Sequence, residues 1–397
     1  MKKILGARSS AALVLDRVIR TGAYSNVAVA RTEVDPASAH GHFQRLVYTA
    51  LRYLPFIDGT IEQHAARSVN DVDPMVMSIL RIAIGEVVFL DAEPHAVVNE
   101  AVRSSRILGR GRAAGFVNAV LRSTTAAQPQ PGDLVAASYP GGLTTMLNRD
   151  HDDQWVTDFL LASNQAPQIG VRYRDGRMAD SDIPHTAYVN DDVTGEVASG
   201  TLDVMDPASA AVAVALAVRP GDTVVDLAAA PGGKTRAIAD AAGNTGFVVG
   251  SDIHQRRVRD AAKRTHTPSR ISWMVADAVA PALRRGVFDR VLLDAPCTGL
   301  GTMRRRPEIR FRVDSDAPAS YGILQRRMLT RAMEGVRPGG RLVYSVCTVT
   351  AHETTGVVAG LGFRAPNDLP GDDYGDGLLL SPHRTNTDGM FIAVWDA

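Results

Sequence analysis

Hydrophobic residues in the first third of the chain recur every three or four positions, which places them on one face of a helix. One such stripe runs from Phe43 to Leu54, and another from Val76 to Val88. Pro74 and Pro94 each follow an acidic residue. Proline fits the first turn of a helix but not its interior, so helices should begin at both prolines. The pattern predicts a helical bundle up to about residue 125.

The pattern changes beyond Gly221, where short β-branched runs alternate with alanine- and arginine-rich stretches of helical length. This alternation predicts βαβ units and a Rossmann-like, doubly wound, mostly parallel sheet. A last buried strand is expected at residues 391–395. The other expected strands span residues 223–227, 247–251, 271–276, 291–293 and 341–345.

These two patterns predict three parts. A helical domain is expected over residues 1–130, because the proline-rich stretch 126–133 has little to bury and resembles a linker. A linking segment with a small mixed α/β subdomain should cover residues 131–205. The Rossmann-like domain should cover residues 206–397.

Composition narrows the class of protein. The chain has 397 residues, of which 45% are hydrophobic, and its 43 basic and 43 acidic residues balance. Nucleic-acid binding would therefore need local basic patches. Two cysteines exclude a four-cysteine zinc site and a secreted disulfide framework. No hydrophobic run is long enough for a membrane span, and the start is too soon interrupted by charge for a signal peptide. We expect a cytoplasmic protein with no metal and no membrane partner.

A small-residue turn after the first expected strand points to a nucleoside ligand. Val224–Thr235 contains the turn Ala228, Ala229, Ala230, Pro231, Gly232, Gly233, followed by Lys234. A helix N-terminus after such a turn offers free N–H groups. A P-loop would need glycine at position 228, and the dinucleotide fingerprint is absent. A doubly wound nucleoside site without phosphate remains, and S-adenosylmethionine is such a ligand.

Three acidic residues follow the next strands, at Asp252, Asp277 and Asp294. A carboxylate just past the second strand is placed to accept hydrogen bonds from ribose hydroxyls, so Asp252 is the ribose candidate. Aspartate is also common at turns and helix caps, which is the structural alternative for each residue alone.

Both cysteines stand at the ends of hydrophobic runs, Cys297 after Asp294-Ala-Pro and Cys347 after Tyr344-Ser-Val. A lone cysteine is most often a small buried hydrophobe. Ligand crevices lie outside the carboxyl ends of parallel strands, however, so both thiols are predicted to face one substrate. Methylation of carbon 5 of cytosine requires a thiolate to add to carbon 6, and an acid nearby stabilises the adduct.

These motifs resemble the cytosine-5 RNA methyltransferases of the NOL1/NOP2/Sun family. The resemblance rests on Asp226–Thr235, Asp294-Ala-Pro-Cys297-Thr-Gly, Tyr344-Ser-Val-Cys347-Thr and Asp388-Gly-Met-Phe-Ile392. It implies that Cys347 attacks carbon 6, that Cys297 assists release, and that Asp294 lies between cofactor and cytosine. It also implies that residues 228–234 cradle S-adenosylmethionine, with Asp252 at its ribose and Asp277 near its adenine. Thr348 stands where the family usually has serine, and Asp206–Ala210 departs from the usual glutamine pattern.

The helical part resembles the RNA-binding domain of the NusB antitermination factor, through His95–Val102 and Gly115–Arg122. Members with this domain imply 16S ribosomal RNA as the substrate, unassembled or partly assembled, without an obligate protein partner. Basic residues beyond Cys297 are expected to bind phosphates beside a flipped base. They are Arg304, Arg305, Arg306 and Arg310, with Arg312 nearby. Two alternatives stay open, the same reaction on transfer RNA and a non-catalytic RNA-binding assembly factor.

Overall fold

The computed structural model describes residues 4–124, 127–177, 181–190, 192–265, 271–281 and 284–397, and it divides into two compact units. Unit 1 comprises residues 1–165 together with 303–313, and unit 2 comprises 166–302 and 314–397. The division differs from the expected boundary near residue 130. Part of the linker expected there, residue 126, lies outside the described residues. Helix α8 (Leu134–Ser138) packs on α4 (Leu54–Ala65), which attaches the linking segment to the first unit.

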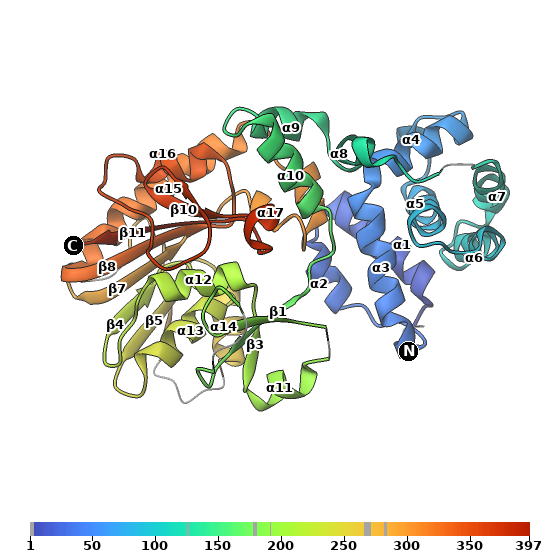
Figure 1. The fold of residues 1–397 in the computed structure, drawn as a ribbon. Coiled ribbons are helices and arrows are strands. Elements are labelled where there is room, and N and C mark those ends of the chain that lie inside the picture. Colours follow the sequence, from blue (N-terminus) through green and yellow to red (C-terminus); the bar gives the residue numbers. More distant parts are fainter. Residues whose placement is uncertain (1–3, 125–126, 178–180, 191, 266–270, 282–283) are drawn as a thin grey trace. The chain divides into compact units, whose positions relative to one another are not determined.

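Unit 1 is helical, as the hydrophobic pattern predicts (Figure 1). Helix α5 is its centre and contacts α1, α3, α4, α6 and α7. Phe43, Leu80 and Val117 are fully or almost fully buried in the shared core. The remaining bounds are α1 Ala7–Thr21, α2 Ser25–Ala30, α3 His40–Arg52, α5 Pro74–Phe89, α6 Pro94–Ile107, α7 Ala114–Ser123, α9 Gly141–Leu147 and α10 Asp153–Ser163, with short 3-10 turns η1 Ala37–Ala39, η2 Val69–Asp71, η3 Gly111–Ala113, η4 Pro131–Asp133 and η6 Pro307–Phe311.

The predicted helix starts at the two prolines are confirmed. Pro74 is the first residue of α5 and Pro94 the first of α6. The side chain of Asp73 accepts hydrogen bonds from the backbone N–H groups of Met75 and Val76, at 2.9 and 3.2 Å. These donors have no partner within the helix, so the cap stabilises its first turn.

Unit 2 contains an eight-stranded sheet in the order β6-β5-β4-β7-β8-β11-β10-β9. Strands β4 to β8 pair in parallel, and β9, β10 and β11 are antiparallel. This confirms the predicted Rossmann-like sheet and the last buried strand. The bounds are β4 Thr223–Asp226, β5 Phe247–Asp252, β6 Ile271–Val275, β7 Phe288–Asp294, β8 Val336–Val346, β9 Asp372–Tyr374, β10 Gly377–Leu380 and β11 Met390–Asp396.

Helices cover both faces of this sheet. Val224, Leu292 and Val343 share a core with α12 and α13. Their sequence neighbours Val225 and Val291 point to the other face, because side chains alternate along a strand, and they line a cavity with Ala332 of α15. Helix bounds are α11 Thr194–Ser199, α12 Pro207–Ala215, α13 Gly233–Ala242, α14 Gln255–Arg264, α15 Ala317–Gly335, α16 Thr355–Val358 and α17 Pro382–Thr385, with turns η5 Leu300–Thr302 and η7 Ala351–Glu353. No helix in the described ranges is long and hydrophobic enough to cross a membrane.

A second, three-stranded sheet in the order β2-β1-β3 precedes the large one. Its strands are β1 Ile169–Tyr173, β2 Thr186–Val189 and β3 Leu202–Val204. The buried Arg172 donates to Asp203 of β3 and to Asp240 of α13, both at 2.6 Å. This arginine therefore fixes the small sheet to the helix that follows the expected cofactor turn.

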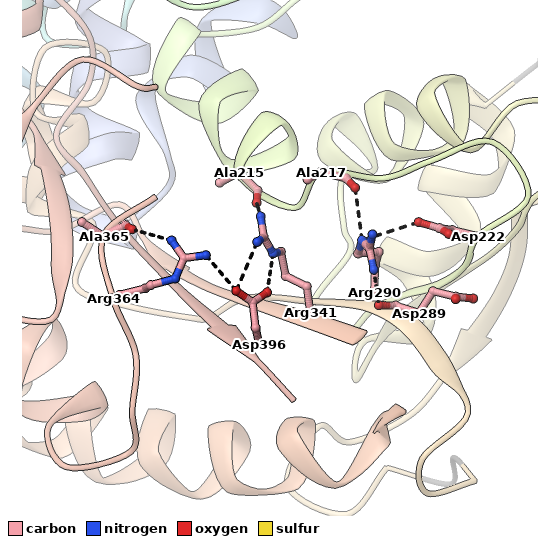
Figure 2. Close-up of polar contacts among 9 residues, drawn as sticks. All are labelled: Ala215, Ala217, Asp222, Asp289, Arg290, Arg341, Arg364, Ala365 and Asp396. Carbon is pink, nitrogen blue, oxygen red and sulfur yellow. Dashed lines mark hydrogen bonds and ion pairs between the residues drawn. The ribbon is translucent and has the colours of Figure 1, made fainter. Parts of the chain in front are cut away.

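Three arginines bind the last strand and the chain after α12 to the large sheet (Figure 2). Asp396, in the last strand, accepts from Arg341 at 2.7 Å and from Arg364 at 2.7 Å. Arg341 also donates to the carbonyl of Ala215, at the end of α12, and Arg290 of β7 donates to that of Ala217. These ion pairs and hydrogen bonds thus stabilise the edge of the large sheet that lies opposite the carboxyl ends of its parallel strands.

We expect Asp396→Ala to lower the free energy of unfolding by at most about 1 kcal/mol, because the three side chains are partly exposed to solvent. Burial alone would raise the pKa of Asp396, but hydrogen bonds from Arg341 and Arg364 outweigh it and lower that pKa. Asp396 therefore stabilises the protein at pH values above the pKa that its carboxyl group has in the unfolded chain. This stabilisation is lost as the pH falls through the lower pKa of the folded protein. Urea unfolding of both proteins over an acidic pH series measures this. A difference that does not shrink in acid would contradict it, and Asp175→Ala at an exposed local pair is the control.

Candidate functional site

The carboxyl ends of β5, β4, β7 and β8 converge on one edge of the large sheet in unit 2. Asp252, Asp226 and Asp294 are the last residues of β5, β4 and β7, and Cys347 directly follows β8. In open parallel sheets the ligand crevice lies at this edge, beside the strand where the connections change direction. Here that strand is β4, which lies between β5 and β7.

The turn after β4 is held by backbone hydrogen bonds. The N–H of Ala229 donates to the carbonyl of Ser251 at 2.8 Å, and the N–H of Gly232 donates to that of Ala229 at 2.7 Å. Gly232 has a φ of +102°, a backbone conformation that favours glycine. A Cβ there would lie 3.2 Å from the Trp273 ring. The small residues at positions 228–233 therefore form a tight turn directly before α13.

Asp226 is a buried carboxyl group that the sequence prediction did not single out as a site residue. Its Oδ2 accepts from the Thr235 hydroxyl at 2.7 Å, whereas its Oδ1 is buried and makes no hydrogen bond within the described residues. Burial raises its pKa to about 7, and the charge of Asp294 contributes. A buried acceptor without a donor at this edge can accept a hydrogen bond from the ammonium group of a bound ligand or from a water molecule. This fits a nucleoside that carries an amino-acid group.

Two of the predicted cofactor acids, Asp252 and Asp277, occupy different environments. Asp252 is buried, and its Oδ1 accepts from the N–H of His254 at 2.8 Å. It adjoins Ser251, whose carbonyl holds the turn after β4. Asp277 is exposed, and its Oδ1 accepts from the N–H of Val279 at 2.8 Å. Both thus order local turns, and Asp252 also lies beside the small-residue turn.

Asp294 connects the turn after β4 to the strand that carries Cys347. Its Oδ2 accepts from the Lys234 ammonium at 2.7 Å, and its Oδ1 accepts from the Ser345 hydroxyl at 2.8 Å. Burial would lower the pKa of Lys234, but the charge of Asp294 and its hydrogen bond outweigh this and raise it. Asp294 therefore stabilises the charged form of Lys234.

The two thiols meet. Cys297 Sγ lies 3.4 Å from Cys347 Sγ, and both side chains are half-buried and free of disulfides. The hydrogen bond to Cys347, together with burial and the charge of Cys347, raises the pKa of Cys297 well above its ordinary value. Burial and the neighbouring Cys347 thus favour the protonated form of Cys297.

Two facing glycines fix the loop after Cys297 against the loop after Cys347. The Gly301 N–H donates to the carbonyl of Cys347 at 3.0 Å, and the Gly389 N–H donates to the carbonyl of Gly301 at 2.8 Å. A Cβ on Gly301 would lie 2.0 Å from the Gly389 oxygen. The Asp388-Gly389 motif is thus explained by backbone packing, which no short sequence window reveals.

The basic segment after this loop corrects the expectation for two of its arginines. Arg310 is buried within unit 1, where its Nη1 donates to Asn164 Oδ1 at 2.9 Å and to the carbonyls of Arg52 and Ser138 at 3.2 Å each. Its guanidinium also lies 4.0 Å from the centre of the Tyr139 ring. Arg304 is buried as well. Neither presents a guanidinium to RNA in this structure.

Arg305 and Arg306 are only half-buried, so the prediction that they contact RNA still stands. Arg306 lies 5.9 Å from the centre of the Tyr24 ring. Arg312 donates to the backbone carbonyls of Val18, Gly22 and Ala23. Within the part of the chain that the structure describes, no group of three or more histidine, cysteine and acidic side chains is arranged to hold a metal ion.

Two family models match the chain. Residues 213–396 match the family described as 16S rRNA methyltransferase RsmB/F, and residues 5–126 match the NusB family. Ribosomal RNA small subunit methyltransferase B of Vibrio cholerae is 28% identical over 426 residues, covering 98% of this chain and 97% of that protein. The protein of the same name from Salmonella paratyphi B is 29% identical over 429 residues, covering 96% and 99%.

Solved structures share the fold. The crystal structure of PH0851 superposes with a TM-score of 0.80 at 23% identity, covering 99% of both chains. A methyltransferase homologue from Pyrococcus horikoshii gives a TM-score of 0.52 at 22% identity, covering 65% of this chain and 99% of that one. The first of these likenesses extends over both units of the chain.

We expect Gly301→Ala to destabilise unit 2 by about 3 kcal/mol, because the added methyl group overlaps backbone that cannot move independently. Gly195→Ala is the matched control, since a Cβ there meets no atom within 4 Å. Urea unfolding of the three proteins tests the difference. Equal stability of both variants would show that the two loops adapt easily.

We expect Arg310→Ala to destabilise unit 1 by roughly 2–4 kcal/mol, because it opens a cavity and leaves buried carbonyls without a donor. Hydrogen exchange in α3 and α10, followed by mass spectrometry, should rise relative to the exposed control Arg122→Ala. The salt dependence of RNA binding should stay that of the wild type. A reduced salt dependence with unchanged exchange would instead make Arg310 an RNA contact.

Proposed function

Because the chain combines a methyltransferase domain of the RsmB/F family with a domain of the NusB family, we propose that it forms 5-methylcytosine in 16S ribosomal RNA. The rRNA substrate is supported by relatives that match nearly the whole chain and are named for the small ribosomal subunit. The position on the base is supported by one observation above all. Two cysteines that form no disulfide, with their sulfurs 3.4 Å apart, lie at the ligand edge of the sheet.

The family uses S-adenosylmethionine, and the residues at the carboxyl edge fit it. When bound, this cofactor supplies an electrophilic methyl group. Residues 228–234 would enclose it, Asp252 would accept from its ribose, and Asp277 would lie near its adenine. The orphaned Oδ1 of Asp226 would accept from its amino group. The Lys234–Asp294 pair would lie between the bound cofactor and the cytosine base.

Cys347 is the nucleophile in this proposal. Its thiolate adds to carbon 6 of cytosine, and the electron pair of the double bond moves to carbon 5, which then takes the methyl group. Asp294 would accept a hydrogen bond from the exocyclic amine and hold the ring in place. Loss of the carbon 5 proton then expels the Cys347 thiolate and restores the double bond.

Cys297 would accept that proton. Before Cys347 bonds to the base, its hydrogen bond with Cys297 and its charge raise the pKa of Cys297, so Cys297 stays protonated. Bonding of Cys347 to carbon 6 removes that negative charge. Cys297 can then release its own proton to solvent and accept the one from carbon 5. Cys347 therefore ionises first, and Cys297 ionises only after Cys347 has bonded to carbon 6.

The two alternatives are less well supported. Transfer RNA as substrate would leave the NusB-family domain and the names of the relatives unexplained. A non-catalytic assembly factor would have no need for a thiol pair in which one pKa is raised by the other cysteine. Both remain outcomes of the test below.

We expect Cys297→Ala to accumulate a covalent protein–RNA complex and Cys347→Ala to give neither complex nor labelled cytosine. Each variant is incubated with 16S rRNA and methyl-labelled cofactor and analysed on denaturing gels, with Glu196→Gln as a surface control. Parallel reactions contain assembled small subunits or transfer RNA, and the free rRNA should be the preferred substrate. Methylation by Cys347→Ala would remove its role as nucleophile. Cofactor binding by wild type without any methyl transfer would favour the assembly factor.

A further inference from the structure

Glu353 is a fully buried carboxylate between the two cysteine loops, and the mechanism above does not use it. It closes the turn η7 and has no exposed surface. Burying a charged group is costly unless it is hydrogen-bonded, so a carboxylate at such a position needs an explanation. Its surroundings provide one.

Both thiol loops donate to this carboxylate. From the Cys297 loop, the N–H of Thr298 donates to Oε1 at 2.7 Å and its hydroxyl donates to Oε2 at 2.6 Å. From the Cys347 loop, the hydroxyls of Thr348 and Thr350 contact Oε2 at 3.1 and 2.9 Å. Each thiol is therefore one residue away from a threonine that contacts Glu353.

A third element completes the cluster. Gln325 of α15 donates to Glu353 Oε1 at 3.4 Å and to the carbonyl of Pro296, the residue before Cys297, at 2.9 Å. The hydroxyl of Tyr344, at the end of β8, donates to the backbone carbonyl of Glu353 at 2.7 Å. The cluster thus spans β8, α15 and both loops.

The hydrogen-bond donors of the cluster converge on the carboxyl group of Glu353. Five donors from Thr298, Thr348, Thr350 and Gln325 contact its two oxygens. The hydroxyls of Thr298 and Thr348 are also 2.8 Å apart, so the two thiol loops meet at this group.

We propose that Glu353 is a positioning residue that sets the separation of the two thiols by holding Thr298 and Thr348 on one carboxylate. The inference rests on the proposed function of the thiols and adds a residue to it. Glu353 acts through the two threonines, whose hydroxyls contact its carboxyl oxygen. A shift of about 1 Å in a reacting group can cost on the order of 100-fold in rate, so this separation matters for catalysis.

The first test is Glu353→Gln, which preserves shape but replaces one acceptor oxygen by a donor and removes the charge. We expect kcat to fall about 100-fold, with KM for rRNA and for the cofactor unchanged, because no substrate contact is lost. Glu196→Gln is the matched control, an exposed glutamate of the same unit. A change in KM together with the fall in kcat, or an unchanged kcat, would overturn the proposal.

The second readout needs no RNA. Alkylation of Cys297 by iodoacetamide, followed by peptide mass spectrometry over a pH series, reports the ionisation of its thiol. The hydrogen bond with Cys347 is the largest cause of the raised pKa of Cys297, and the charge of Glu353 is a smaller one. In Glu353→Gln the midpoint for Cys297 should therefore move to lower pH. General loosening would instead speed alkylation of both thiols at every pH without moving the midpoint, and would contradict positioning.

A second pair of variants guards against misfolding of Glu353→Gln. Thr298→Val removes the hydroxyl and keeps the size, whereas Thr298→Ser keeps the hydroxyl. We expect the valine variant to lose kcat and the serine variant to retain it. Equal activity of the two would refute the role of this contact. Because alkylation is read without substrate, failure of the positioning role is distinguishable from failure of the proposed methylation, which would appear in the wild type itself.

Discussion

The parallel pairing of β7 with β8 places the chemistry of this protein, because it aligns Asp294 with Ser345 at the same edge of the sheet. The chain leaves both strands in the same direction, and each loop then carries a cysteine within three residues of that pair. The hydrogen bond from Ser345 to Asp294 closes the edge, and Lys234 reaches the same carboxylate from α13. A shift of β8 by one residue would turn Ser345 to the opposite face of the sheet and separate it from Asp294.

The acidic side chains at this edge of the sheet differ in their hydrogen-bond partners. Asp294 is paired with the ammonium group of Lys234 at 2.7 Å. One carboxyl oxygen of Asp226 has no hydrogen-bond partner among the described residues, and burial raises the pKa of this group to about 7. Glu353 is saturated with donors and has no capacity left for a substrate. Three acids of similar chemistry thus serve different purposes because their hydrogen-bond partners differ.

Much of this arrangement was predictable from sequence, and the exceptions have physical reasons. The strands at residues 223–227 and 247–251, the helix starts at Pro74 and Pro94 and the meeting of two thiols follow from local patterns and from the geometry of parallel sheets. Glu353 was not predictable, because its partner Thr298 lies 55 positions earlier in the chain. Arg310 misleads for the opposite reason. A run of arginines suggests a solvated or RNA-facing surface, and only tertiary packing on Tyr139 and Asn164 shows that its guanidinium is interior.

The segment 303–313 gives unit 1 a discontinuous path along the chain. Its Glu308 accepts from both the backbone and the hydroxyl of Ser25, and its Arg310 reaches residues that precede it by more than a hundred positions. The helical part therefore includes a segment that lies between the two cysteines in the sequence. Deleting it would strand a buried glutamate and a buried arginine on the remaining half, so a simple truncation yields an incompletely folded protein rather than a minimal enzyme.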